Sequence, residues 1–260
     1  MESDAMANST LTTAQGRRIA YVRTEGAAPG VVFLGGFKSD MTGTKAQALQ
    51  AWAEREGRAF LRFDYSGHGA SSGDFLDGSI GDWAADAMAA IAALTEGPQV
   101  LVGSSMGGWI ALLVARAMPD RVAGLVGIAA APDFTEDSMW AAFSAAQREE
   151  MAATGRVALP SDYADGPYII TKRLIEDGRR QLVLRTPLGF AFPVRLLQGE
   201  ADVDVLPSVA LRLFGHLTGA DVRLTLVKGA DHRFSSPECL ALIETTVAEV
   251  LARSLAEGRG

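Results

Sequence analysis

The stretch that decides the fold is residues 99–109, QVLVGSSMGGW. It begins with an apolar run, and good helix formers follow at 110–118, so the pattern predicts a strand, a sharp turn and a helix. The turn carries the spacing G-x-S-x-G centred on Ser105, and the positions two residues before and after Ser105 must lack side chains because the bend is tight. Such a bend presents the hydroxyl beside the positive end of the helix. Ser105 is therefore a candidate nucleophile, and the alternative is a plain glycine-rich turn.

Strand and helix patterns alternate on both sides of this stretch. Apolar runs between turn residues predict strands, and apolar residues at helical spacing predict helices. The expected strands are 17–24, 31–34, 59–63, 100–102, 122–129, 194–198 and 222–227, and the expected helices are 45–56, 79–95, 109–118, 208–217 and 237–255. This alternation predicts one α/β domain over residues 1–260, with a mostly parallel central sheet covered by helices on both faces.

The alternation breaks between residues 132 and 187. No buried strand is expected there, and the sequence is amphipathic helix, glycine, proline and charge. We predict a helical insertion over 132–187 that folds over the active-site mouth as a lid, and the alternative is extra helices packed on the scaffold. Met139, Trp140 and Phe143 are candidates to line an acyl pocket, although such a stripe also suits ordinary packing.

The composition is that of an ordinary globular protein. Of 260 residues, 48% are hydrophobic and 21% charged, and the formal net charge is −7. No long run of Lys or Arg is present, which disfavours a nucleic-acid surface or a polybasic membrane patch and favours small molecules or proteins as partners. The single Cys239 allows no internal disulfide and belongs to no cluster that could bind zinc. We therefore predict neither a metal nor a cofactor.

The compartment is inferred from what the sequence lacks. Residues 1–16 are polar, without the basic start and apolar run of a secretory signal. No stretch reaches the uninterrupted apolar length that a bilayer requires. The lone cysteine suits a reducing compartment. These observations predict a cytoplasmic protein without a membrane span.

A serine nucleophile needs a base and a group that orients the base. Of the three histidines, His232 lies just beyond the end of a predicted strand, at the sheet edge where parallel strands place their ligands. His216 falls in the middle of a predicted helix and His68 in a turn. His232 is therefore the candidate base.

Three acids follow the expected strand at 194–198, namely Glu200, Asp202 and Asp204. A carboxylate in this loop can reach the loop after the next strand, so the residues alone leave Asp202 and Asp204 both open as the orienting acid. The alternative is a solvated acidic loop.

Acyl transfer also needs donors for the developing oxyanion, and backbone N–H groups suit this role because they are in place before the charge forms. One candidate is the N–H of Met106, directly after Ser105. The other is the N–H of Phe37, because the preceding Gly35 and Gly36 allow close approach of the chain. The alternative is that these glycines only form a turn.

Five segments together carry a family resemblance: FLGGFKSDMTGTKA, RFDYSGHGASSG, GPQVLVGSSMGGW, RLLQGEADVDV and GADHRF. They resemble the alpha/beta-hydrolase superfamily, and more closely the branch of mitochondrial palmitoyl-protein thioesterases that also serve as acyl-glucuronide esterases. The likeness runs from about residue 20 to the final helix and includes 160–168. Two positions depart from the pattern: Gly35-Gly36 replaces the usual His-Gly, and Leu206 stands where a proline is expected.

The resemblance implies an alpha/beta-hydrolase fold and a serine hydrolase that cleaves carboxylic esters or thioesters through an acyl-enzyme. The site residues it implies are the nucleophile Ser105, the base His232, the acid Asp202 rather than Asp204, and the oxyanion donors Met106 and Phe37. It assigns the D-x-x-G-x-G turn at 64–69 to scaffolding, so His68 is not expected to be catalytic. The expected partner is a small acyl ester or thioester, or an acylated protein. Hydrolysis of C–C or peptide bonds, or a non-catalytic binding module, are the alternatives.

Overall fold

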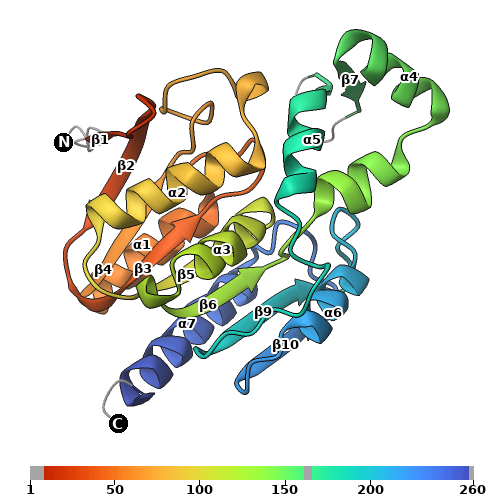
Figure 1. The fold of residues 1–260 in the computed structure, drawn as a ribbon. Helices are drawn as coiled ribbons and strands as arrows, with labels where there is room; N and C mark the ends of the chain where they lie inside the picture. Colours follow the sequence, from red (N-terminus) through yellow and green to blue (C-terminus); the bar gives the residue numbers. More distant parts are fainter. Residues whose placement is uncertain (1–8, 161–165, 258–260) are drawn as a thin grey trace.

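A central sheet of eight strands organises the structure, a computed structural model that describes residues 9–160 and 166–257 (Figure 1). The strands are β1 (Ser9–Thr12), β2 (Arg18–Thr24), β3 (Ala27–Leu34), β4 (Arg58–Phe63), β5 (Gln99–Ser104), β6 (Val122–Ile128), β9 (Val194–Gly199) and β10 (Val222–Val227). Their order across the sheet is β1-β2-β4-β3-β5-β6-β9-β10. The pairs β1–β2 and β2–β4 are antiparallel, and all other neighbours are parallel. The predicted mostly parallel sheet is confirmed.

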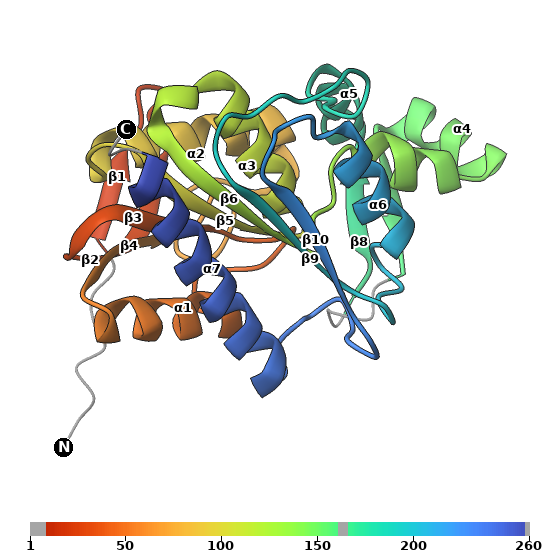
Figure 2. The same cartoon turned by 90° about the horizontal axis from the view of Figure 1, so that it is seen from below.

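Helices cover both faces of this sheet, as the sequence predicts. They are α1 (Thr44–Arg55), α2 (Ile80–Leu94), α3 (Met106–Ala117), α6 (Pro207–His216) and α7 (Pro237–Glu257), with the short 3-10 turns η1 (Phe75–Asp77) and η2 (Pro119–Arg121). One face carries α1 and α7, and the other carries α2 and α3 (Figure 2). Along β5, Leu101 packs with α2 and α3, whereas Val100 and Val102 pack with α1 and α7. Because both faces are buried, the central strands are apolar without alternation.

The segment 132–187 leaves the sheet after β6. Its elements are the π-helix η3 (Thr135–Trp140), α4 (Ala145–Thr154), β7 (Arg156–Leu159), β8 (Tyr168–Thr171) and α5 (Lys172–Arg180). The structure differs from the predicted helical insertion in one respect, since β7 and β8 pair antiparallel as a second sheet. Each strand has only four residues and one fully buried side chain, Val157 or Ile170, which is too short for a detectable alternation.

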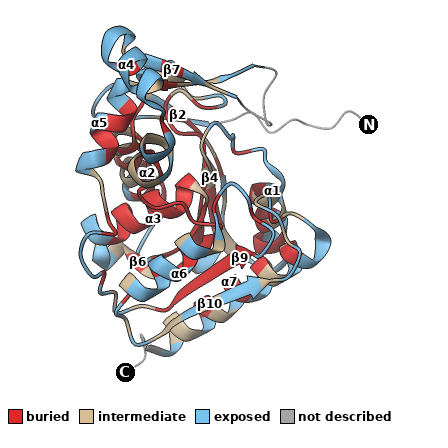
Figure 3. Cartoon of the chain, turned by 90° about the vertical axis from the view of Figure 1, so that its right-hand side faces the viewer, coloured by how far each residue is buried: buried red, intermediate tan, exposed pale blue. Residues whose placement is uncertain are grey.

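The insertion is well exposed at its tip. Apart from Met151, α4 has no fully buried residue (Figure 3). Residues 161–165, which belong to the stretch 160–168 of the family resemblance, lie outside the described residues. The division into a single domain with 132–187 as its lid stays a prediction.

Asp133 ties the start of the insertion to its end. Its fully buried carboxylate accepts hydrogen bonds from the backbone N–H groups of Val183 at 2.8 Å and Leu184 at 2.9 Å. The Arg185 guanidinium adds an ion pair at 3.1 Å. Asp133 has a φ of 58°, in the left-handed region that Asp and Asn enter more readily than most residues. The conformation and the hydrogen bonds of this one residue therefore set where the insertion begins.

Replacing Asp133 by Asn is expected to lower the free energy of unfolding by about 2 kcal/mol, because a buried backbone N–H loses its charged acceptor. Asn tolerates the same backbone conformation, so the loss reports the hydrogen bonds rather than strain. Urea unfolding followed by circular dichroism measures it, with E149A on the exposed surface of α4 as the control. A loss no larger than that of E149A would contradict the anchoring role of Asp133.

Candidate active site

Ser105 lies where β5 meets α3, in a bend that few residues adopt. Its backbone has φ 53° and ψ −118°. Side chains are excluded two residues before it and two residues after it. A Cβ at Gly103 would lie 2.3 Å from the Gly107 carbonyl oxygen, and a Cβ at Gly107 would lie 2.0 Å from the Leu34 carbonyl oxygen. The G-x-S-x-G spacing is thus a consequence of backbone segments in direct contact.

Hydrogen bonds hold this strained residue in place. The Ser105 N–H donates to the carbonyl of Ile128 at 2.9 Å, and the Ser105 carbonyl accepts from the N–H groups of Gly108 at 2.9 Å and Ala131 at 3.0 Å. A sparsely populated backbone conformation costs of order 1–3 kcal/mol and persists only where its surroundings enforce it. Here β6, the start of α3 and the chain after β6 together enforce it, so the half-buried hydroxyl has one defined position.

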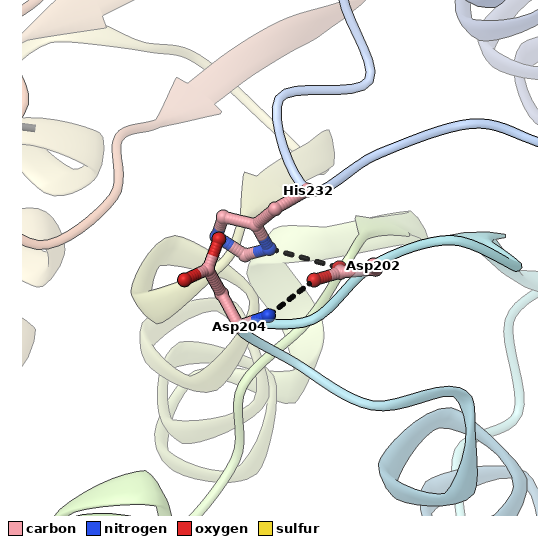
Figure 4. A group of neighbouring side chains, drawn as sticks. All are labelled: Asp202, Asp204 and His232. Carbon is pink, nitrogen blue, oxygen red and sulfur yellow. Dashed lines mark hydrogen bonds and ion pairs between the residues drawn. The ribbon is translucent and has the colours of Figure 1, made fainter. Parts of the chain in front are cut away.

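His232 approaches Ser105 from the loop after β10. Its Nε2 lies 3.1 Å from the Ser105 hydroxyl oxygen, and its Nδ1 lies 2.9 Å from Oδ2 of Asp202 in the loop after β9 (Figure 4). The two loops are joined, because the Ala201 N–H donates to the Ala230 carbonyl at 3.0 Å. Three side chains from three separate loops therefore lie within hydrogen-bonding reach of one another at one edge of the sheet.

Asp202 is almost completely buried, and each of its carboxylate oxygens accepts two hydrogen bonds. Oδ1 accepts from the backbone N–H groups of Asp204 at 2.9 Å and Val205 at 2.8 Å. Oδ2 accepts from the Gln198 amide and from His232, both at 2.9 Å. Burial alone would raise the pKa of Asp202, but these hydrogen bonds, above all that of His232, lower it below its usual value. An ionised carboxylate here can orient the imidazole and stabilise its protonated form.

Asp204 belongs to the same loop as Asp202, and its carboxylate lies close to the His232 ring (Figure 4). Within residues 9–160 and 166–257, these three side chains are the group with the spacing of a metal site, since one ligand atom from each lies within 4.8 Å of the others. Asp202 would have to give up hydrogen bonds to coordinate a cation. The arrangement therefore fits an acid that orients a base better than it fits a metal ligand.

The two peptide groups expected at the oxyanion both lie beside Ser105. Met106 opens α3, and the first N–H groups of a helix have no intrahelical acceptor. Phe37 follows Gly36, where an added Cβ would lie 3.5 Å from the Ser105 Cβ. Phe37 and Met106 line the same cavity as Ser105 and His232. The structure therefore brings together all five residues that the sequence marks for the site.

A cavity of about 960 Å³ opens onto Ser105. Its apolar lining includes Phe37, Met106, Phe134, Met139, Tyr168, Val205 and Val209, and its charged lining includes Lys38, Asp40, Lys45, Asp137, Asp204 and Arg233. The insertion supplies several of these side chains. Of its three expected pocket residues, Met139 lines the cavity, whereas Trp140 and Phe143 pack against each other with ring centroids 5.7 Å apart. Tyr168 was missed, because it lies in a strand too short to be detected.

The other two histidines contact backbone groups. His216 is at the end of α6, where Nδ1 lies 3.0 Å from the Arg212 carbonyl oxygen. His68 is buried in the turn after β4 and contacts the backbone of Lys38. The choice of His232 as the candidate base thus agrees with the geometry.

Comparison with known proteins defines the class. The alpha/beta hydrolase family model matches residues 31–257, and the chain belongs to this family. Mitochondrial palmitoyl-protein thioesterase ABHD10 of Rattus norvegicus is 36% identical over 234 residues, which cover 90% of this chain and 78% of that protein. Alpha/beta hydrolase domain-containing protein 10 from mouse is similar in structure, with a TM-score of 0.88, 34% identity, and coverage of 95% of this chain and 98% of that one. A protein from Agrobacterium vitis S4 has a TM-score of 0.90 at 39% identity, with coverage of 94% and 98%.

These comparisons confirm the alpha/beta-hydrolase fold, the resemblance to the thioesterase branch and the prediction of a hydrolase. The prediction of a cytoplasmic protein is wrong, because relatives at 34% to 36% identity are named as mitochondrial. That prediction depended on the polar residues 1–16 and on the single cysteine. Neither feature distinguishes the cytoplasm from the mitochondrion, because both compartments keep thiols reduced. In the described part of the chain, no helix is long and apolar enough to cross a membrane.

The lowered pKa of Asp202 makes part of the stability depend on pH. A carboxylate with a lower pKa in the folded than in the unfolded chain stabilises the fold above the unfolded value, near 3.9 for Asp, and this contribution is lost as the pH falls through the folded value. Between about pH 5 and about pH 2, the free energy of unfolding should therefore fall more steeply for the wild type than for D202N, which cannot titrate there. Urea unfolding at each pH measures how steeply the free energy of unfolding changes for each protein, and equal slopes would contradict a lowered pKa of Asp202.

Proposed function

We propose that the protein hydrolyses carboxylic esters or thioesters through a covalent acyl-enzyme on Ser105. The observation that carries this proposal is the pair of contacts made by His232, 3.1 Å to the Ser105 hydroxyl and 2.9 Å to Asp202. Further support comes from relatives named palmitoyl-protein thioesterase and from the apolar lining of the cavity. The expected substrate is a small acyl ester or thioester, or an acylated protein.

In the first half of the proposed reaction, the Ser105 oxygen attacks the acyl carbonyl carbon while His232 Nε2 takes the hydroxyl proton. Asp202 stabilises the imidazolium that forms, as an ionised, hydrogen-bonded carboxylate is suited to do. The negative charge on the former carbonyl oxygen is met by the N–H groups of Met106 and Phe37. The tetrahedral intermediate then collapses, and His232 returns the proton to the departing alcohol or thiol.

In the second half, water replaces the leaving group. The water oxygen attacks the acyl carbon while His232 takes a proton from the water, and the same two N–H groups bind the second oxyanion. Collapse of this intermediate returns the proton to Ser105 and releases the carboxylic acid. The apolar lining suits an acyl chain, because apolar surface removed from water contributes roughly 25 cal/mol per Å² to binding.

Removing the nucleophile should abolish turnover without unfolding the protein. For S105A we expect kcat/KM to fall by roughly 10⁴-fold or more, the loss typical of a serine nucleophile. The measurement is steady-state hydrolysis of p-nitrophenyl esters, acyl-CoA, palmitoylated peptide and aminoacyl amides, with unfolding curves to verify the fold. Full activity of S105A on every substrate would contradict the proposal, and a preference for the amides would contradict the proposed bond type.

Neighbouring aspartates in one loop offer a matched control for this experiment. D202N should lower kcat by roughly 10⁴-fold, because an amide cannot hold the imidazole in the required tautomer. D204N changes a carboxylate of the same loop but leaves the contact between Asp202 and Nδ1 of His232 in place, so its kcat should stay within about tenfold of the wild type. If kcat fell more in D204N than in D202N, the orienting acid would be Asp204 instead.

A further inference from the structure

His68 is a buried polar residue that the proposed reaction leaves without a role. It lies in the turn after β4 and is only 4% exposed. Its ring packs edge-on against the rings of Tyr65, Phe75 and Trp83, with centroid distances of 5.5, 5.1 and 5.0 Å. These contacts from the turn, η1 and α2 leave the ring one orientation. A buried imidazole also needs partners for its two nitrogens, because an unpaired buried polar atom is costly.

Both nitrogens of His68 have partners. Nδ1 lies 3.2 Å from the Ser66 carbonyl oxygen, which can only accept, so Nδ1 carries the hydrogen. Nε2 is then an acceptor, and the backbone N–H of Lys38 donates to it at 3.3 Å. The pKa of His68 is lowered, mainly by burial and also by the charge of Lys38. The hydrogen bond to Ser66 and the charge of Asp86 act in the opposite direction. The uncharged ring is the form that can accept from Lys38.

The peptide that His68 contacts belongs to the oxyanion loop. Lys38 follows Phe37 directly and has a φ of 56°, in the left-handed region that a lysine rarely adopts. The N–H of Lys38 is in the same peptide plane as the carbonyl of Phe37, so a bond to it restricts how the Phe37 backbone can rotate. The Phe37 ring is held as well, with centroids 4.9 Å from Phe75 and 6.0 Å from Tyr168.

We propose that His68 is a positioning residue of the active site, which holds the Phe37–Lys38 peptide through Nε2 so that the Phe37 N–H faces the oxyanion. This inference rests on the proposed function, because it gives His68 a task only if Phe37 is an oxyanion donor. It also accounts for the left-handed conformation of Lys38, because the hydrogen bond from the Lys38 N–H offsets the cost of that conformation.

Two substitutions separate the hydrogen bond from the packing. H68F keeps an aromatic ring but removes the acceptor, whereas H68Q keeps an acceptor near the position of Nε2 but removes the ring. We expect kcat of H68F to fall roughly 10- to 100-fold, less than the 10²- to 10³-fold typical when an oxyanion donor is removed altogether. KM should change by less than about threefold, since the effect is confined to the transition state. H68Q should keep a higher kcat than H68F, and H216Q, at the end of α6, should behave as the wild type.

A transition-state analogue and a spectroscopic measurement complete the test. A trifluoromethyl ketone, which places an oxyanion next to the serine, should bind to H68F more weakly by about the same factor as the loss in kcat/KM. If kcat of H68F is at least as high as that of H68Q, the packing of the ring matters rather than the hydrogen bond, and the inference is overturned. Nitrogen-15 shifts of the wild-type histidines report the tautomer without activity or mutation, and a protonated Nε2 on His68 would also overturn it. A wild type that neither turns over nor binds the ketone would instead contradict the proposed function.

Discussion

The backbone of Ser105 is the constraint on which the site depends. A non-glycine residue at φ 53° is stable only because β5 is central in the sheet and can be held from both sides, by β3 and by β6. The Gly107 position touches the end of β3, and the Ser105 N–H bonds the end of β6. A side chain at Gly107 would collide with the end of β3, and one at Gly103 would collide with the start of α3. The strain at Ser105 is thus offset by contacts with β3 and β6 as well as by the start of α3.

Parallel topology explains how residues far apart in the sequence reach this serine. β9 and β10 are parallel neighbours in register, with Gly199 opposite Val227, so both strands end at the same level. The loops that follow therefore start side by side, and Asp202 and His232 extend from them toward the end of β5. The loop after β3 reaches the same edge and brings Phe37. Order in the chain and position at the sheet edge together determine which side chains can meet.

Much of this arrangement could be predicted from the sequence, because it depends on backbone patterns. The apolar runs at β5 and β9 mark strands that are buried on both faces, and glycine spacing marks the bend. The sequence pattern alone could not decide between Asp202 and Asp204, because the choice depends on which carboxylate accepts hydrogen bonds from the N–H groups of its own loop. The strands β1, β7 and β8, of four residues each, were missed because too few residues alternate. The contact of His68 with Lys38 could not be predicted, because it depends on a left-handed backbone conformation at Lys38 that no sequence pattern indicates.

The convergence of three loops is expected to activate a single hydroxyl, that of Ser105. Reaction with a fluorophosphonate, followed by mass analysis of the peptides, identifies which side chain is activated. We predict one adduct, on the peptide that contains Ser105, and much slower formation of this adduct when His232 is replaced by alanine. An adduct on another residue, or a folded protein in which Ser105 is not modified at all, would contradict the account.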